Sequence, residues 1–334
     1  MKRVVSLLAS SMPFIIIAGL LYASFFIKPQ PGGSVLKMPQ FERGDHFYGL
    51  AMPESRVIWM VGGGGKIFRS EDGAESWVRQ VSGTHMALQD VAAWDGKRAV
   101  AVGNERVVIV TSDGGLSWHP ADISSQNLTG RKWLRVRALP NGEAWVVGEG
   151  GAAFRSADFG QHWERLGAVE DVAWNDVQFR DGHVLLVGEF GRIKSSSDSG
   201  KTWISTKSPV ETSLMGVAFR NSNNAVAVGL GGVILSSQDG GKTWKQEQSP
   251  SQEHLYSVIW DGDRWVAVGD KGIAVILSVD GTSMVTQVVP GNRSWYTAII
   301  SSGERYFLAG ATFAIVGKNI ASSNVITASR GSAQ

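Results

Sequence analysis

Seven copies of one pattern, about 41 residues apart, run from residue 45 to the end of this 334-residue chain. Each copy contains an apolar run that ends in a Val-Gly or Ala-Gly step. The glycines of these steps, separated by 41, 45, 40, 41, 40 and 41 residues, are Gly62, Gly103, Gly148, Gly188, Gly229, Gly269 and Gly310. Five copies also share a tryptophan near their end: Trp77, Trp118, Trp163, Trp203 and Trp244. A period of this size is typical of solenoids and propellers.

The content of one repeat decides between these two architectures. Residues 214–248 hold four short runs rich in apolar and β-branched residues, separated by turn signals such as Asp239-Gly240-Gly241. Four short strands without a helical period predict a four-stranded meander, which must stack radially against its neighbours to bury both faces. The 41 glycines of the chain argue against helical repeats. The sequence therefore predicts an all-β, seven-bladed β-propeller over residues 45–334.

Composition excludes several classes of protein. The net charge of +2 and the absence of a basic stripe argue against nucleic-acid binding. The chain has no cysteine, so it can form neither disulfides nor thiolate metal sites. Its six histidines lack metal-ligand spacing, and Gly62–Lys66 resembles a phosphate loop only superficially, because Ile67 follows the lysine. We therefore expect no metal and no cofactor.

The N-terminal residues predict a membrane anchor. Lys2 and Arg3 precede an uncharged stretch of 24 residues, Val4 to Ile27, and about 20 apolar residues span a bilayer. A cleaved signal peptide, which has a shorter apolar region, is the alternative. We expect residues 1–28 to be a single-pass signal anchor in the inner membrane with its N-terminus in the cytoplasm and the propeller in the periplasm. Residues 29–44 are expected to be a linker, in which 34–43 supply an edge strand that closes the ring.

A second motif, Ser-x-Asp-x-Gly-x-x-Trp, precedes the repeated tryptophans. Its serine and aspartate are expected to bond to the backbone of their own hairpin between the third and fourth strands, while its tryptophan fills the gap between blades. Val285 occupies the tryptophan position of the sixth copy. The motif resembles the Asp-box, or BNR, repeat. Its structural aspartates are Asp72, Asp113, Asp158, Asp198, Asp239 and Asp280.

Asp-boxes also occur in sialidases, so an exported glycoside hydrolase or a small-ligand propeller is an alternative function. Sialidase-like chemistry requires an arginine triad, a tyrosine nucleophile with a supporting glutamate, and an aspartic acid. The Phe-Arg-Ile-Pro signature of that family is missing, and the boxes are expected on the face opposite the usual binding site of a propeller. We therefore expect no catalysis.

The repeats resemble the photosystem II stability/assembly factor family. The resemblance rests on Leu214–Phe219, Ala225–Gly229, Gly232–Ser237 and the box segment Asp239–Trp244. It implies a non-catalytic seven-bladed propeller that binds membrane-protein subunits during assembly. The chain departs from photosynthetic members because it lacks a lipobox cysteine and a twin-arginine signal. Relatives in non-photosynthetic bacteria often occur beside resistance-nodulation-division (RND) transporters, which implies an inner-membrane protein or transporter complex as partner.

Alignment of the repeats predicts three columns along the first strands, which line the channel. The first column should be buried and consists of Phe47, Leu88, Leu134, Trp174, Leu214, Leu255 and Trp295. Two residues further on, a crowded channel wall should consist of Gly49, Asp90, Val136, Asp176, Gly216, Ser257 and Thr297. The column between them lacks a uniform packing character, so we expect specificity there: Tyr48, Gln89, Arg135, Asn175, Met215, Tyr256 and Tyr296.

The third repeat is four residues longer than its neighbours, and the extra length falls in residues 122–130. A cluster follows at once: Arg131, Lys132, Trp133, Arg135 and Arg137. Arginine and tryptophan are enriched in interface hot spots, so we predict a partner-docking patch with a part-exposed Trp133; a solvated edge is the alternative. Glu149 and Glu189 from the short turns, with Tyr48, Asn175, Tyr256 and Tyr296, complete the candidate site. The expected channel mouth holds scattered polar residues and one arginine, which favours a scaffold over an enzyme.

Overall fold

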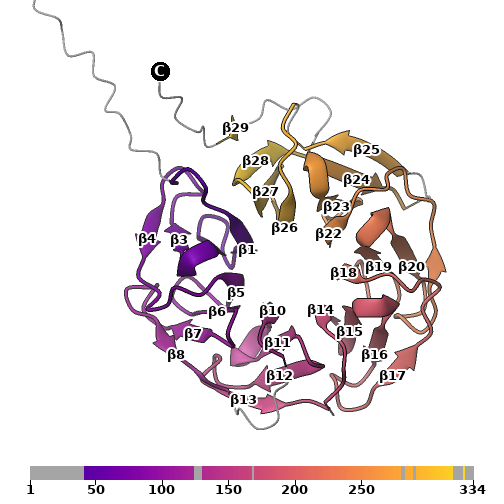
Figure 1. Cartoon of the computed structure of the whole chain (residues 1–334), viewed down its shortest axis with the longest axis horizontal. Helices are drawn as coiled ribbons and strands as arrows, with labels where there is room; N and C mark the ends of the chain where they lie inside the picture. Colours follow the sequence, from indigo (N-terminus) through magenta and orange to yellow (C-terminus); the bar gives the residue numbers. More distant parts are fainter. Residues whose placement is uncertain are drawn as a thin grey trace, which may run out of the picture. The chain divides into compact units, whose positions relative to one another are not determined.

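Seven antiparallel sheets surround a central axis in the computed structural model of the protein (Figure 1). The structure describes residues 41–123, 130–167, 169–279, 283–288, 291–318 and 326–327. The predicted all-β, seven-bladed propeller is confirmed. The predicted signal anchor (1–28) and most of the linker lie outside the described residues. Within the part of the chain that is described, no helix has both the length and the hydrophobicity to span a membrane.

Each of the seven sheets is one blade, numbered here in chain order. Blade 1 consists of β1 (Phe47–Ala51), β2 (Ile58–Gly62), β3 (Ile67–Ser70) and β4 (Val78–Gln80). Blade 2 consists of β5 (Leu88–Ala93), β6 (Ala99–Gly103), β7 (Val108–Thr111) and β8 (His119–Pro120). Blade 3 contains β10 (Trp133–Ala138), β11 (Ala144–Gly148), β12 (Ala152–Ser156) and β13 (His162–Arg165). Blade 4 consists of β14 (Trp174–Arg180), β15 (His183–Gly188), β16 (Ile193–Ser196) and β17 (Ile204–Thr206).

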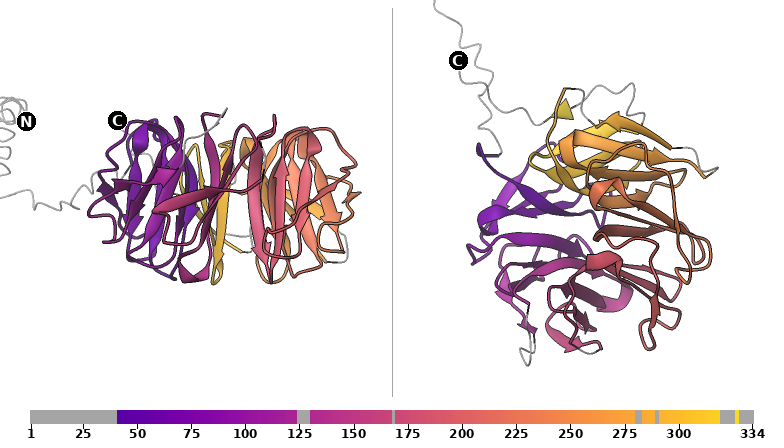
Figure 2. Two further views of the ribbon diagram at one scale, coloured as in Figure 1. Left: turned by 90° about the horizontal axis from the view of Figure 1, so that it is seen from below. Right: turned by 45° about the vertical axis from the view of Figure 1, so that its right-hand side comes forward.

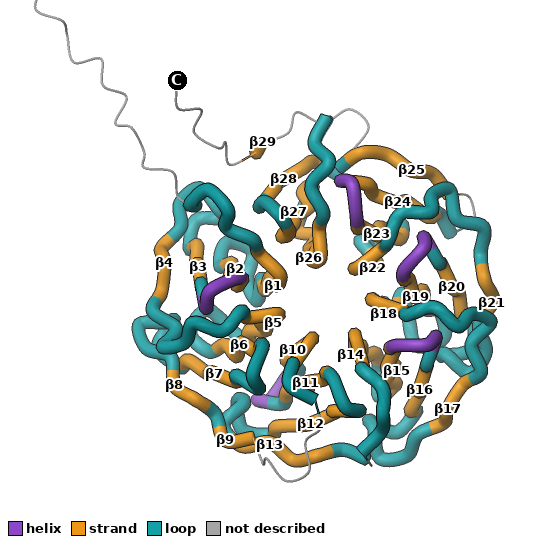
Figure 3. Tube along the Cα trace, in the orientation of Figure 1, coloured by secondary structure: helices purple, strands orange, loops and turns teal. Residues whose placement is uncertain are grey.

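Blades 5 to 7 follow the same plan. They consist of β18 (Leu214–Phe219), β19 (Ala225–Gly229), β20 (Ile234–Ser237) and β21 (Lys245–Gln246), then β22 (Leu255–Trp260), β23 (Trp265–Gly269), β24 (Ile273–Leu277) and β25 (Ser283–Gln287), then β26 (Tyr296–Ser302), β27 (Arg305–Gly310), β28 (Ala314–Gly317) and β29 (Ile326–Thr327). In the described part of the chain, five single turns of 3-10 helix connect strands (Figure 3): η1 (Gly63–Gly65), η2 (Pro140–Gly142), η3 (Glu189–Gly191), η4 (Leu230–Gly232) and η5 (Asp270–Gly272).

The second strand of each blade explains the repeated apolar run and its final glycine. Strands such as β6 and β19, both Ala-Val-Ala-Val-Gly, are buried along their whole length because a neighbouring blade covers each face. A Cβ atom at Gly62 would lie 2.0 Å from the carbonyl oxygen of His46, and one at Gly269 would lie 1.8 Å from that of His254. The backbone that leads into each first strand crosses this point, and the other five repeat glycines make the same close approach. The Val-Gly anchor is therefore a packing requirement.

Aromatic packing joins the first and last blades. The ring of Phe41 lies 5.0 Å from that of Phe47, 5.8 Å from that of Trp77 and 6.2 Å from that of Phe313 in blade 7. Residues 41–44 form turns rather than a strand, the remaining residues of the predicted edge strand lie outside the described part, and β29 completes the sheet of blade 7. Aromatic side chains of the two blades therefore pack across the seam between blades 7 and 1.

Blade 3 differs from the others at its outer edge. The strand β9 (Asp122–Ile123) pairs in parallel with β13, so this blade has five strands. The extra length predicted from the sequence begins in this strand and continues through residues 124–129, which lie outside the described residues. The insertion therefore begins as an added edge strand directly before the predicted patch.

The Asp-box hairpins have the predicted local chemistry. In blade 4, the Ser196 hydroxyl donates to Asp198 Oδ1 (2.7 Å) and accepts from the buried Gly200 amide (2.9 Å), while Asp198 accepts from the amide (2.8 Å) and hydroxyl (2.6 Å) of Thr202. Equivalent bonds form at four further boxes, those of Asp72, Asp113, Asp158 and Asp239. Asp280 lies outside the described residues. These contacts give the boxes a structural role.

The box hydrogen bonds predict a specific dependence of stability on pH. The bonds from Thr202 lower the pKa of Asp198 from 3.8 to about 2. Because the folded pKa is depressed, the stabilisation is present above pH 3.8 and is lost as the pH falls towards 2. Asp198→Ala should therefore lower the thermal midpoint at pH 6, and its difference from wild type should shrink between pH 4 and pH 2. Asp263→Ala, at an exposed aspartate outside the boxes, should leave the thermal midpoint at pH 6 nearly unchanged in calorimetry. A difference for Asp198→Ala that is constant over pH would contradict the assignment.

Candidate functional site

The two faces of the propeller are built from different connections. The turns between second and third strands and the connections between blades form one face, called here the top face; the Asp-box hairpins form the other, the box face (Figure 2). Box residues bond to the turn between the first and second strands of their own blade, as in Gly114 N–H to Lys97 O (2.9 Å) and Ser199 N–H to Gly182 O (2.8 Å). The boxes therefore lie opposite the top face, as the sequence predicted.

A β-bulge marks the start of the first strand in every blade. In blade 1, Phe47 pairs with Gly62 and Gly49 with Val61, so Tyr48 between them has no ladder partner. The corresponding bulge residues are Gln89, Leu134, Asn175, Met215, Tyr256 and Thr297. Bulges often re-aim a side chain near a functional site, and seven of them form a ring at the top of the channel.

The bulge positions correct the predicted columns in blades 3 and 7. Trp133 pairs with Gly148 and Tyr296 with Gly310, so these two residues, rather than Leu134 and Trp295, belong to the buried first column. Trp133 is only 2% exposed, and its ring lies 5.4 Å from that of Phe154. The prediction of a part-exposed Trp133 is therefore wrong. Tyr296 is also fully buried, and Thr297 takes its place in the ring.

Three predicted site residues do lie at bulges, and their side chains have partners. Tyr48 stacks on Trp295 with 5.9 Å between ring centroids. Asn175 is buried and donates to the carbonyl oxygen of Leu214 (2.8 Å). Burial and the carboxylate of Asp270 raise the pKa of Tyr256 to about 12, so its phenol stays protonated near neutral pH. These residues form a polar and aromatic rim.

Two members of the predicted patch reach the solvent of the top face. The side chains of Arg131 and Lys132 are 74% and 48% exposed. Arg131 lies 3.7 Å from Glu105, Lys132 lies 3.8 Å from Glu149, and Glu149 also accepts from the Arg131 amide (3.0 Å). Within blade 4, Glu189 accepts from the amide of Ala173 (2.9 Å), which directly precedes β14. Arg131, Lys132 and the two glutamates thus lie along the turns of blades 3 and 4, with mixed charge.

Arg135 and Arg137 instead join a buried ion-pair cluster. Arg137 donates to Asp90 of blade 2 (3.0 Å) and to Asp176 of blade 4 (2.8 Å), and Arg135 lies 3.6 Å from Asp176. The Asp90 side chain is 2% exposed, and burial raises its pKa although the two guanidinium groups oppose the rise. The prediction that the channel mouth holds no convergent carboxylates and one arginine is wrong, because two of each converge here.

Backbone amides also bond to the two carboxylates of this cluster. Asp90 accepts from the Val136 amide (3.0 Å), and Asp176 from the amides of Val177 (2.9 Å) and Val217 (3.1 Å). The cluster therefore links blades 2 to 5 with two arginines and two aspartates, although the Nε atoms of Arg135 and Arg137 are buried without a hydrogen-bond partner. Across the described residues, no group of three or more His, Cys, Asp or Glu side chains could hold a metal ion.

Phe190 is a surface residue that the sequence reasoning missed. It lies in η3 on the top face, is 68% exposed and has a φ angle of 55°. The corresponding turn position is glycine in blades 1, 3 and 5, at Gly64, Gly150 and Gly231, and a charged residue with a similar φ angle in blades 2 and 6, at Glu105 (52°) and Lys271 (53°). An L-residue in the left-handed region is disfavoured by about 1–2 kcal/mol, so three of the seven turns carry this cost. The signal in the sequence was a large apolar residue at a turn position that is otherwise glycine or charged in the turns compared.

Comparison with known proteins identifies related chains. The family model described as Photosynthesis system II assembly factor YCF48 matches residues 82–205 and 196–293. The Photosystem II assembly protein Ycf48 of Synechococcus sp. (strain JA-3-3Ab) is 29% identical over 154 residues, which is 44% of this chain and 45% of the relative. The Photosystem II assembly lipoprotein Ycf48 of Synechococcus sp. (strain CC9902) is 24% identical over 117 residues, 34% of this chain and 35% of the relative. The matches thus span less than half the length of these curated relatives.

A solved structure described as YCF48 bound to D1 peptide has the same fold. It superposes with a TM-score of 0.67 at 18% identity and covers 81% of this chain and 92% of that one. At this identity the likeness shows the fold alone.

Proposed function

The chain belongs to the Photosynthesis system II assembly factor YCF48 family, and on that premise we propose that it is a non-catalytic assembly factor that binds a polypeptide segment of a membrane protein on its top face. The observation that carries the proposal is Phe190, a large apolar side chain that is 68% exposed in a backbone conformation suited to glycine. Neither packing nor the turn requires it, so contact with a partner is the function that accounts for it.

The surroundings of Phe190 suit a polypeptide ligand. Arg131, Lys132, Glu149 and Glu189 supply charged groups of both signs on the neighbouring turns, and Tyr48, Asn175 and Tyr256 line the mouth of the channel. An aromatic anchor surrounded by polar groups is the usual anatomy of an interface hot spot. The solved YCF48 with a D1 peptide supports a polypeptide as the ligand class. The ion pairs and amide bonds of Asp90 and Asp176 are consistent with a structural role for the two aspartates, which link neighbouring blades.

Membrane association is part of the same proposal. One relative is named a lipoprotein, which supports work at a membrane surface. For this chain we propose the uncharged stretch Val4–Ile27 as a single-pass inner-membrane anchor, with the propeller in the periplasm. A partner held in the same membrane would then meet the top face at high effective concentration.

Replacing Phe190 by glycine should weaken binding of the partner without lowering the stability of the propeller. We expect Phe190→Gly to weaken capture of the membrane partner by about 30-fold, which corresponds to roughly 2 kcal/mol for a hot-spot side chain. The thermal midpoint should not fall, because relief of the left-handed strain offsets the greater entropy of glycine in the unfolded chain. The measurement is quantitative co-purification of integral membrane proteins from detergent extracts with the tagged full chain.

Leu116→Ala is the matched control, because Leu116 is 89% exposed in the box hairpin of blade 2, on the opposite face. Equal capture by Phe190→Gly and wild type would contradict docking on the top face. Mass spectrometry of the captured protein also names the complex. An RND transporter subunit is the partner that the sequence resemblance implied, and a photosystem subunit is the one that the names of the relatives imply.

A further inference from the structure

Box tryptophans fill the gaps between successive blades. The rings of Trp118 in blade 2 and Trp59 in blade 1 lie 5.6 Å apart, and those of Trp203 in blade 4 and Trp145 in blade 3 lie 6.2 Å apart. Trp77 packs 5.1 Å from Phe313 across the seam between blades 7 and 1. Trp163 and Trp244 likewise join the core clusters that link their blades to the preceding ones. Each of these five gaps therefore accepts an indole from the blade that follows it.

The gap between blades 5 and 6 lacks this side chain. Val285 stands 41 residues after Trp244, at the tryptophan position of blade 6, and is 41% exposed. On the other side of the gap, Val226 occupies the position in the second strand that Trp59, Trp145 and Leu185 occupy in blades 1, 3 and 4 and that Val100 occupies in blade 2. Val226 packs in one core cluster with Trp265 of blade 6.

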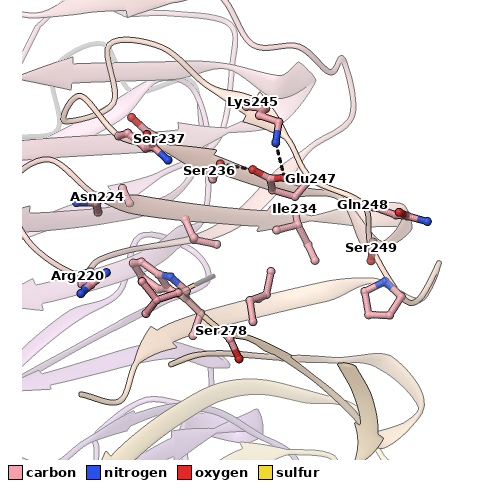
Figure 4. Close-up of a pocket in the computed structure, with 17 residues that line it drawn as sticks. Arg220, Asn224, Ile234, Ser236, Ser237, Lys245, Glu247, Gln248, Ser249 and Ser278 are labelled. Carbon is pink, nitrogen blue, oxygen red and sulfur yellow. Dashed lines mark hydrogen bonds and ion pairs between the residues drawn. The ribbon is translucent and has the colours of Figure 1, made fainter. Parts of the chain in front are cut away.

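A cavity of about 1040 Å³ lies at this gap (Figure 4). Its apolar wall includes Val226, Ile234, Trp265 and Leu277. Along its outer strand, the Ser236 hydroxyl donates to Glu247 (2.6 Å), and Glu247 pairs with Lys245 (3.0 Å). The volume reaches the upper end of the range for small-molecule sites, so it exceeds the space that one missing indole leaves.

We propose that the gap between blades 5 and 6 is a binding site for a tryptophan side chain that another polypeptide inserts. The homologous gaps of the same molecule set the chemistry, because in five of them the box tryptophan of the following blade packs between two blades. The additional volume accommodates the main chain on either side of the inserted residue, and the polar edge formed by Ser236, Lys245 and Glu247 offers donors and acceptors for its peptide groups. The site lies between two blades and none of its lining residues belongs to a first strand at the channel, and it does not rest on the function proposed for the top face.

The test titrates the full chain with the tripeptide acetyl-Gly-Trp-Gly-amide, observed by saturation-transfer NMR, against acetyl-Gly-Leu-Gly-amide. We expect the tryptophan peptide to bind with a dissociation constant of about 1 mM and the leucine peptide at least tenfold more weakly. Val285→Trp should supply the missing indole in cis, raise the thermal midpoint and reduce binding of the peptide at least tenfold. Val78→Trp, which adds an indole at an exposed position of β4 in blade 1, should bind the peptide as wild type does.

Several results would overturn the proposal. One is failure of the tryptophan peptide to bind the wild-type chain, and another is binding that Val285→Trp leaves intact. Free indole that binds as tightly as the tripeptide would make this a site for small aromatic molecules rather than for a polypeptide. If Val285→Trp does not fold, Val279→Trp provides the second variant, because Val279 lines the cavity and is 56% exposed.

Discussion

Replacing Trp133 by alanine should lower the free energy of unfolding by about 3–5 kcal/mol. The side chain is 2% exposed and belongs to the core cluster that joins blades 2 and 3, in which it contacts Phe154 edge to face. Removing the indole would leave a cavity between blades 2 and 3. The strands of these two blades cannot move in to close it, because each strand is held in a hydrogen-bonded sheet. Denaturant titration of the variant measures the effect.

Leu134→Ala is the matched control, since Leu134 is the adjacent bulge residue and is only half-buried. It should lower the stability much less than Trp133→Ala does. A Trp133→Ala protein with unchanged stability and lost partner capture would instead make Trp133 a docking residue, as the sequence first suggested.

Replacing Asp176 by alanine should also lower the free energy of unfolding by about 3–5 kcal/mol. The change removes the acceptor of Arg137 and of two backbone amides, those of Val177 and Val217. It leaves a guanidinium charge with one aspartate fewer and buried N–H groups without a partner, and both effects destabilise the folded state. The measurement is the same denaturant titration.

Two comparisons sharpen this result. Asp171→Ala, at an exposed aspartate in the connection before β14, should leave stability nearly unchanged. A double variant of Asp176→Ala with Arg137→Ala should be less destabilised than the sum of the two single variants, because removal of both charges leaves neither unpaired. Additive effects would contradict the coupling between Asp176 and Arg137.

The repeat made the fold predictable, but the register of the first strands was predictable only in part. The Val-Gly steps and the box motif predicted both the number of blades and the face of the propeller on which the box hairpins lie. In blades 3 and 7, however, two large apolar residues stand side by side, Trp133-Leu134 and Trp295-Tyr296, and hydrophobicity alone does not choose between them. A bulge shifts the alternation by one residue, and a one-residue slip exchanges the buried and exposed positions.

The ion-pair cluster depends on that register. Asp90 and Arg137 are 47 residues apart and meet only when blades 2 and 3 are aligned correctly. The predicted register placed Arg135 in the column of Tyr48 and Asn175. It therefore did not predict that Arg135 lies beside the buried carboxylates of Asp90 and Asp176. Phe190 and Val285 were different: each departs from most other copies of the repeat at a single position, and comparison of the copies reveals such departures without coordinates.

The most direct test of docking on the top face is site-specific photo-crosslinking. A benzophenone amino acid is placed at position 190 of the full chain, or at position 116 on the box face, and cells are irradiated before the membranes are solubilised. We expect an adduct with one integral membrane protein from position 190 and none with that protein from position 116. Absence of an adduct at position 190, or the same adduct from both positions, would contradict the assignment of the top face as the docking surface.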